Sequence, residues 1–115
     1  MEITRLYTGE GGESYFQQVD IPLKDEGDIG KLSEGIDSKE IFFRETEGDY
    51  DYDYHNAPQR QYIIILDGEI EITNSLGEKR RFKSGDIILV EDTEGKGHKT
   101  RSIDGKLRRS IFITI

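Results

Sequence analysis

Short apolar runs separated by turn-forming residues cover the chain, and the spacing of their apolar positions is that of β-strands. The runs are rich in Ile, Val, Tyr and Phe, and the segments between them are rich in Gly, Asp, Asn and Ser. No stretch shows an apolar repeat of about 3.6 residues, so little helix is expected. Regularly spaced short strands are typical of sandwiches and closed barrels, and we predict an all-β fold. The expected strands cover residues 3–8, 15–21, 41–45, 61–66, 69–73, 79–82, 86–90, 98–102 and 107–115.

Local composition also predicts the connections between these strands. Asp67-Gly68 lies between two apolar runs and predicts a tight hairpin. Residues 11–14 and 25–35 are rich in Gly and charge, and we expect them to be loops that cap the barrel, the second with a helical turn around residues 29–32. The run from Tyr62 to Leu66 has no polar alternation. This predicts a strand with one face inside the barrel and the other against an added layer or a second subunit.

Length and charge narrow the class of protein. The 115 residues fit one domain, which we divide into N-terminal strands and loops (1–44) and a core that carries the candidate chemistry (45–115). The formal net charge of -8 disfavours nucleic acid and anionic membrane surfaces as partners, because both would be repelled. The chain has no cysteine, which excludes disulfides, thiol catalysis and thiolate metal sites. No signal peptide or membrane span is recognisable, and a cytoplasmic location is expected.

Two histidines are the main candidates for chemistry. His55 and His98 each lie beside a glycine-punctuated strand, and they would share one cavity if these segments were neighbours in a barrel. A lone histidine in a small domain is more often a surface or packing residue. His55 and His98 are nevertheless the candidate catalytic residues, because they would be the chain's only proton carriers with a pKa near neutrality. Strand alternation places the remaining candidates on the same two faces. These faces carry His55, Ala57, Gln59, Gln61, Ile63 and Ile65 on one segment, and His98, Thr100 and Ser102 on the other.

The first of these segments resembles a motif of the cupin superfamily, a group of small jelly-roll barrels with two signature motifs on facing strands. The resemblance covers residues 53–101. His55 matches the first histidine of the first motif, Ala57 stands where the second histidine belongs, and Gln61 replaces the glutamate. Gly68 falls at the spacing expected for the glycine that follows. The resemblance implies a double-stranded β-helix, or jelly-roll, fold.

The second segment resembles the second cupin motif. Gly85 opens the strand, and Gly95 with His98 matches its Gly-x-x-His ending. The proline of that motif is absent, the stretch between the two glycines is longer than usual, and Ser102 stands where asparagine is common. The resemblance therefore implies the fold together with an altered site.

The resemblance also implies a metal site, because cupins use three histidines and a glutamate to hold iron, manganese, nickel, zinc or copper. This chain keeps two of those imidazoles. We hypothesise that His55, Gln61 and His98 form a weak, open site for a divalent Fe, Mn, Ni or Zn ion. The alternative for Gln61 is a cavity-lining amide that bonds to a neighbouring group. Gln59, Gln61, Thr100 and Tyr54 are the candidate ligand-binding residues.

The stretch from residue 45 to 54 has five acidic residues at alternate positions and leads into His55. An EF-hand loop is excluded, because the sixth and twelfth positions counted from Asp49 are Tyr54 and Arg60 rather than Gly and Glu. A solvated acidic loop or an edge strand is the simplest interpretation. The functional alternative is that Asp53 supports His55, with Tyr52 or Tyr54 closing over a ligand.

Two functions follow from these residues. The protein is either an enzyme that acts on a sugar, carbonyl compound or small organic acid through a weak metal or the histidine pair, or a sensor or storage module that binds a small ligand without chemistry. A second copy of the chain is the expected protein partner. Residues 63–66 and 111–115 carry more apolar surface than one barrel interior needs, which predicts a homodimer.

Overall fold

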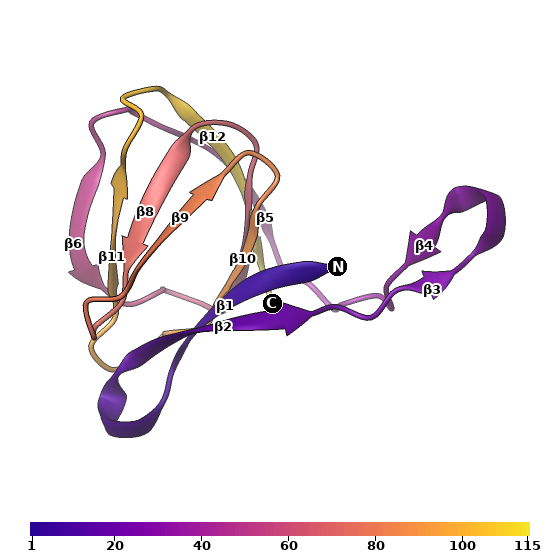
Figure 1. Ribbon diagram of the computed structural model, residues 1–115, viewed down its shortest axis with the longest axis horizontal. Helices are drawn as coiled ribbons and strands as arrows, with labels where there is room; N and C mark the ends of the chain where they lie inside the picture. The colour runs from indigo at the N-terminus through magenta and orange to yellow at the C-terminus, as the bar shows by residue number, and fades with distance from the viewer.

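Two facing β-sheets form the body of the protein (Figure 1). The computed structural model describes residues 1–115. One sheet has six strands in the order β2-β1-β10-β7-β12-β5, and the other has four in the order β6-β11-β8-β9. The strands of the six-stranded sheet are β1 (Glu2–Thr8), β2 (Ser14–Asp20), β5 (Ile41–Thr46), β7 (Gln61–Ile65), β10 (Ile87–Val90) and β12 (Arg108–Thr114). Those of the four-stranded sheet are β6 (Asp51–His55), β8 (Glu69–Thr73), β9 (Lys79–Lys83) and β11 (His98–Ser102).

The apolar core lies between the two sheets. Its side chains come from inward positions of strands in both sheets, as alternation along a strand requires. One cluster of buried apolar residues forms this core: Leu6, Ala57, Ile65, Ile70, Ile72, Phe82, Ile88 and Val90. The predicted all-β fold is therefore confirmed, and the predicted strands agree with the observed ones to within a residue or two at their ends.

One strand pair in the body is parallel. β1 pairs with β10 in parallel, with Thr4 opposite Ile88 and Leu6 opposite Val90. The other strand pairs are antiparallel. β1 also pairs with β2 along its full length, so the N-terminal hairpin is fixed to the body through β10.

The predicted hairpin at Asp67-Gly68 is wrong. A turn does occur there, and Gly68 has a φ of 75°, but the strands on either side of it belong to different sheets. β7 pairs with β10 and β12, whereas β8 pairs with β9 and β11. Asp67 accepts hydrogen bonds from the backbone and side chain of Arg109, and these contacts fix the crossing from one sheet to the other.

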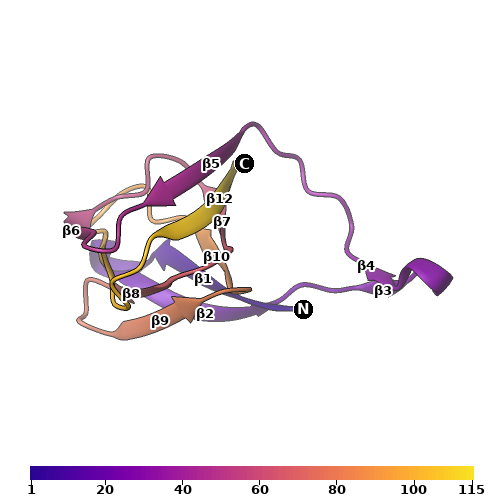
Figure 2. The same ribbon diagram turned by 90° about the horizontal axis from the view of Figure 1, so that it is seen from above.

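Residues 25–35 do not cap the barrel. They belong to an arm that stands away from the body in both views (Figures 1 and 2), built from β3 (Lys24–Asp25), the 3-10 turn η2 (Gly27–Ile29) and β4 (Lys31–Leu32). The expected helical turn is thus found slightly earlier in the chain. Ile29, at the end of η2, is 79% exposed, so the arm buries little apolar surface of its own. The second 3-10 turn is η1 (Glu10–Gly12).

The acidic stretch before His55 forms an edge strand. β6 lies at the edge of the four-stranded sheet and pairs only with β11. Residues 51–54 are all exposed. Charges on an edge strand discourage pairing with another chain, so this part of the interpretation holds. No helix of the structure is long and apolar enough to cross a membrane.

Candidate functional site

A cavity of about 560 Å³ lies between the two sheets. Its volume is within the range of small-molecule sites. Aliphatic and aromatic side chains cover most of its wall, and polar groups gather at two places, which we call the histidine end and the arginine end. The lining residues are Phe42, Phe43, Arg44, Tyr50, Tyr52, His55, Ala57, Pro58, Gln61, Ile63, Ile65, Ile70, Ile72, Val90, His98, Thr100, Arg108, Ser110 and Phe112.

The histidine end is defined by His55 and His98. The two residues are register partners on the neighbouring strands β6 and β11. Their ring centroids lie 4.5 Å apart, and both side chains line the cavity. The prediction that the two imidazoles converge on one cavity is confirmed.

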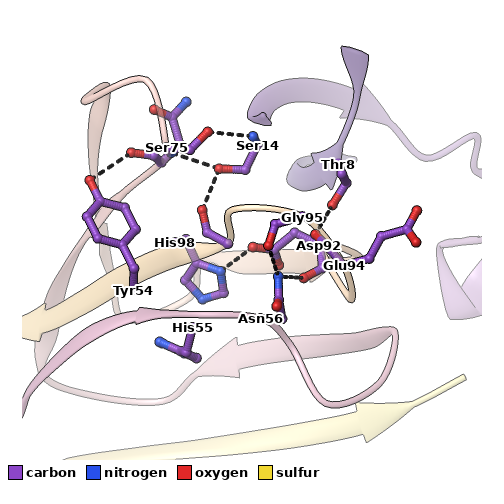
Figure 3. A network of polar contacts seen from close by, with 12 residues as sticks. Thr8, Ser14, Tyr54, His55, Asn56, Ser75, Asp92, Glu94, Gly95 and His98 are labelled. Carbon is purple, nitrogen blue, oxygen red and sulfur yellow. Dashed lines mark hydrogen bonds and ion pairs between the residues drawn. The ribbon is translucent and has the colours of Figure 1, made fainter. Parts of the chain in front are cut away.

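A buried carboxylate orients His98. Asp92 is fully buried, and its Oδ2 lies 2.5 Å from Nδ1 of His98 (Figure 3). A carboxylate only accepts hydrogen bonds, so Nδ1 is the donor, and Nε2 is the ring nitrogen left to interact with a ligand. Nε2 forms no hydrogen bond within the protein. His98 therefore presents a single, oriented basic nitrogen.

Asp92 lies in a loop, residues 91–97, that is tied down from several strands. The carbonyl of Asp92 accepts hydrogen bonds from the backbone N–H of Ala57 and from the amide of Asn56. Thr8 Oγ1 donates to the carbonyl of Glu94, and Ser14 Oγ donates to that of Gly97. Figure 3 shows the contacts of Thr8, Ser14 and Asn56 around His98. The loop thereby holds the Asp92 carboxylate at a fixed position relative to His98.

His55 is held by the backbone rather than by a carboxylate. Its Nδ1 lies 2.8 Å from the carbonyl oxygen of Asp53, and the ring of Tyr52 meets its ring edge-on at 4.3 Å between centroids. Burial lowers the pKa of His55 below its usual range, although the hydrogen bond to Asp53 opposes this effect. The expected support from Asp53 is therefore present through its carbonyl group, while its carboxylate accepts from the N–H of Tyr54.

Sequence reasoning missed the arginine end. Arg108 is only 4% exposed, and its Nε and Nη1 have no hydrogen-bond partner. Ser110 Oγ, next along the same face of β12, also has none. Arg44 lies on the adjacent strand β5, and both guanidinium carbons are 5.5 Å from the centroid of the Tyr50 ring. This end of the cavity is positively charged.

The remaining candidate residues are divided between the cavity and the surface. Gln61 and Thr100 line the cavity, as alternation predicted. Gln59 is exposed and does not line it, because the strand pattern is interrupted at Pro58 between β6 and β7. Tyr54 points to the opposite face of β6 from His55, with its hydroxyl on the carbonyl of Asn74. Neither Gln59 nor Tyr54 is brought to the site.

No model of a known protein family matches this sequence, and no curated protein sequence matches it. Several solved structures are similar to it, among them the following two. The cupin domain of Cnp3 from Schizosaccharomyces pombe is similar with a TM-score of 0.53 and 17% sequence identity, over 97% of this chain and 85% of that chain. The protein NMB1881 from Neisseria meningitidis is similar with a TM-score of 0.52 and 16% identity, over 70% of this chain and 78% of that chain.

Two facing sheets around an internal cavity define this protein as a jelly-roll β-sandwich. The similarity to a cupin domain over nearly the whole chain shows that it has the cupin fold, as predicted. At these identities the likeness concerns the fold alone. The chemistry of the site has to be argued from the residues of this chain.

The donor atoms at the histidine end do not fit a resident divalent metal. No group of three or more His, Cys, Asp or Glu side chains is arranged to hold a metal ion. The hypothesised set of His55, Gln61 and His98 offers two imidazoles and a neutral amide, with no negative charge to offset the ion. Two arginines line the same cavity and would repel it. Metal binding by His55, Gln61 and His98 stays a prediction, and elemental analysis of the purified protein tests it.

Proposed function

We propose that this protein binds a small organic molecule in the cavity between its sheets, with His55 and His98 as the polar contacts at one end. The observation that carries the proposal is the convergence of these two imidazoles on a cavity of about 560 Å³. The apolar wall supplies contact area for the body of a ligand, and the two Nε2 atoms supply directional hydrogen bonds.

The test uses the fact that the chain has only two histidines. Their ring Hε1 protons give two NMR signals, which a His55→Gln variant assigns. Glucose, dihydroxyacetone and benzoate represent the sugar, carbonyl and organic acid classes, and we expect at least one to shift a histidine signal in a saturable manner. Chelator-treated protein is used, with elemental analysis beforehand. If no probe moves either signal at millimolar concentration, the proposal is wrong.

A second candidate function is proton transfer by His98. The observation that favours it is the buried Asp92 carboxylate on Nδ1, which fixes the ring and leaves Nε2 to take a proton from a bound molecule. Dihydroxyacetone and pyruvate carry C–H protons next to a carbonyl group. In D₂O, the protein is expected to exchange such protons faster than buffer, and His98→Asn should abolish the excess. If the protons exchange no faster than in buffer, His98 does not transfer protons, and ligand binding is the only function that remains.

A second copy of the chain is the proposed protein partner. Outward side chains of the six-stranded sheet line an apolar groove that includes Ile64, Ile113 and Ile115. Light scattering at micromolar concentration is expected to give twice the chain mass of 13.2 kDa. Ile64→Lys should give the monomer, and Leu76→Lys, in an exposed turn on the other sheet, should not. A wild-type mass near 13.2 kDa would rule out the dimer.

A further inference from the structure

The arginine end of the cavity contains a buried charge without an ion-pair partner. Arg108 is on β12, where alternation turns Arg108, Ser110 and Phe112 toward the cavity. Only 4% of Arg108 is exposed, and its Nε and Nη1 donors form no hydrogen bond within the protein. A buried charged donor without an acceptor is costly for a folded protein. No group of the protein accepts a hydrogen bond from these donors, so a bound molecule is the candidate acceptor.

The other arginines of the chain are paired, which makes this end exceptional. Arg5, Arg60, Arg80, Arg81, Arg101 and Arg109 all form ion pairs with Asp or Glu side chains. Arg44 and Arg108 form none, and both line the cavity. No Asp or Glu lines the cavity, although acidic residues outnumber basic ones 24 to 16 in the chain. The positive charge of this end is thus local, with Asp104 acting on Arg108 only from outside the cavity lining and without an ion pair.

The two guanidinium groups lie close enough to repel each other. Arg44 is the register partner of Ser110, and Thr46 is that of Arg108, so the two arginines lie on adjacent strands with their side chains on the same face. Both contact the Tyr50 ring, and Arg44 also lies 5.2 Å from the centroid of Phe112. Burial and the charge of Arg44 lower the pKa of Arg108 below its usual range. An anion placed between them would relieve this repulsion.

We propose that Arg108 and Arg44 bind the anionic group of the ligand, a carboxylate or a phosphate, so that the substrate class is an organic oxyanion with an apolar body. The guanidinium group matches the paired oxygens of such anions. The apolar body would contact Phe42, Phe112 and Ile63, which line the wall between the two ends. This inference rests on the proposed function, since it concerns a ligand in the same cavity.

Aromatic rings connect the anion to the histidines. Tyr50 contacts both arginines, stacks on Tyr52 at 6.1 Å between centroids, and Tyr52 in turn meets His55 at 4.3 Å. One wall of the cavity therefore runs from the arginine end to the histidine end through side chains in mutual contact. A ligand held by its anionic group would extend along this wall toward His55 and His98.

The experiment compares acids with their amides. Isothermal titration is carried out with acetate, hexanoate and benzoate, with acetamide, hexanamide and benzamide, and with phenyl phosphate to separate the carboxylate from the phosphate class. We expect at least one oxyanion to bind at least about tenfold more tightly than its neutral counterpart, since hydrogen bonds to a charged group account for such a factor. Equal binding of acid and amide overturns the inference and leaves the proposed function intact. If nothing binds and the histidine signals do not move, both are overturned.

Variants locate the anion. Arg108→Met keeps the apolar part of the side chain and removes the charge, and it should abolish the preference for the oxyanion. The matched control is Arg109→Met, because Arg109 is the next residue, points outward and pairs with Asp67. Its affinity should equal that of the wild type. Retention of the preference in Arg108→Met would contradict the inference.

Stability distinguishes a ligand-binding arginine from a structural one. Without ligand, Arg108→Met should raise Tm by several degrees, because an unpaired buried charge is replaced by an apolar side chain. A lower Tm together with unchanged oxyanion binding would show that Arg108 is structural. If Arg108→Met does not fold, Arg44→Gln carries the test, since Arg44 is only partly buried. It should weaken oxyanion binding several-fold and leave amide binding unchanged.

Discussion

The two ends of the cavity differ in how their polar groups are paired. At the histidine end, Nδ1 of each imidazole is engaged, that of His98 by Oδ2 of Asp92 and that of His55 by the Asp53 carbonyl, and only Oδ1 of Asp92 is buried without a partner. At the arginine end, Arg108 and Ser110 have donors without acceptors. The protein itself orients the two imidazoles at the histidine end. At the arginine end, the buried donors of Arg108 have an acceptor only when a ligand is bound. The difference indicates where orientation is built in and where a ligand supplies the missing charge.

This comparison predicts effects of opposite sign on stability. Removing a group at the histidine end should destabilise the free protein, because its partner is left buried and unpaired. Removing the Arg108 charge should stabilise the free protein, for the reason given above. Two variants at the histidine end test this destabilisation, and a third tests the paired arginines outside the cavity.

The largest effect is expected from Asp92→Ala. The substitution leaves His98, which is 5% exposed, without its partner and also empties the space of a fully buried side chain. We expect a loss of about 3 kcal/mol in the free energy of unfolding, measured by urea denaturation. Asp92→Asn keeps an acceptor oxygen at the same place and should cost less. If Asp92→Ala is as stable as the wild type, the carboxylate does not hold the histidine end together.

A somewhat smaller effect is expected from Gly97→Ala. Gly97 has a φ of 72°, and a β-carbon there would collide with the backbone carbonyl of His55. We expect a loss of about 2 kcal/mol from the close contact and the left-handed backbone together, and displaced His55 and His98 ring signals. Gly77→Ala is the matched control, since Gly77 has a φ of 81° but open space around it. Similar losses in both variants would show that the contact with His55 is unimportant.

The smallest effect is expected from a paired arginine site. Glu91 is 10% exposed and accepts from Arg5 and Arg60. Burial alone raises the pKa of Glu91, but the two arginines outweigh this and hold it below its usual 4.5. The folded state then binds fewer protons than the unfolded state, so this stability is present above the usual pKa and is lost as pH falls through the lowered one. Glu91→Gln should cost about 1 kcal/mol at pH 7.

The pH dependence provides the check on that variant. The stability difference between wild type and Glu91→Gln should shrink as the pH falls below 4.5, because the unfolded wild-type chain binds a proton at Glu91 first, and it should vanish once the pH is below the lowered pKa of the folded state. Urea denaturation at several pH values measures it. A difference that is the same at low and neutral pH would mean that Glu91 acts through packing rather than through charge.

The strands and the convergence of the histidines could be predicted from the sequence because both depend on local patterns. Glycines mark the segments around His55 and His98, and counting every second residue from His55 places Ile63 and Ile65 on the inward face. The partner of His98 could not be found in this way. Asp92 lies in a loop, where strand alternation gives no direction, and its position depends on contacts from three distant segments.

The arginine end was missed because β12 reverses the usual pattern. Ile113 of β12 and Ile115 just after its end line the outer groove, while Arg108 and Ser110 face the cavity beside Phe112. A rule that places apolar residues inside chooses the wrong face of such a strand. Arg108, Ser110 and Phe112 do alternate along β12, but the alternation alone does not tell which face of the strand points toward the cavity. The Asp67-Gly68 hairpin failed for a related reason, since a turn sequence does not specify which sheet the next strand joins.

The parallel pairing of β1 with β10 has a consequence for how the molecule is assembled. Leu6 reaches its register partner Val90 only after most of the chain has been synthesised, although β1 and β2 can pair with each other early. Contacts between residues so far apart in sequence are slow to form, because a long loop has to close first. Until β10 arrives, the second edge of β1 has no strand to pair with, so closure of the six-stranded sheet on this side is expected to be a late step of folding.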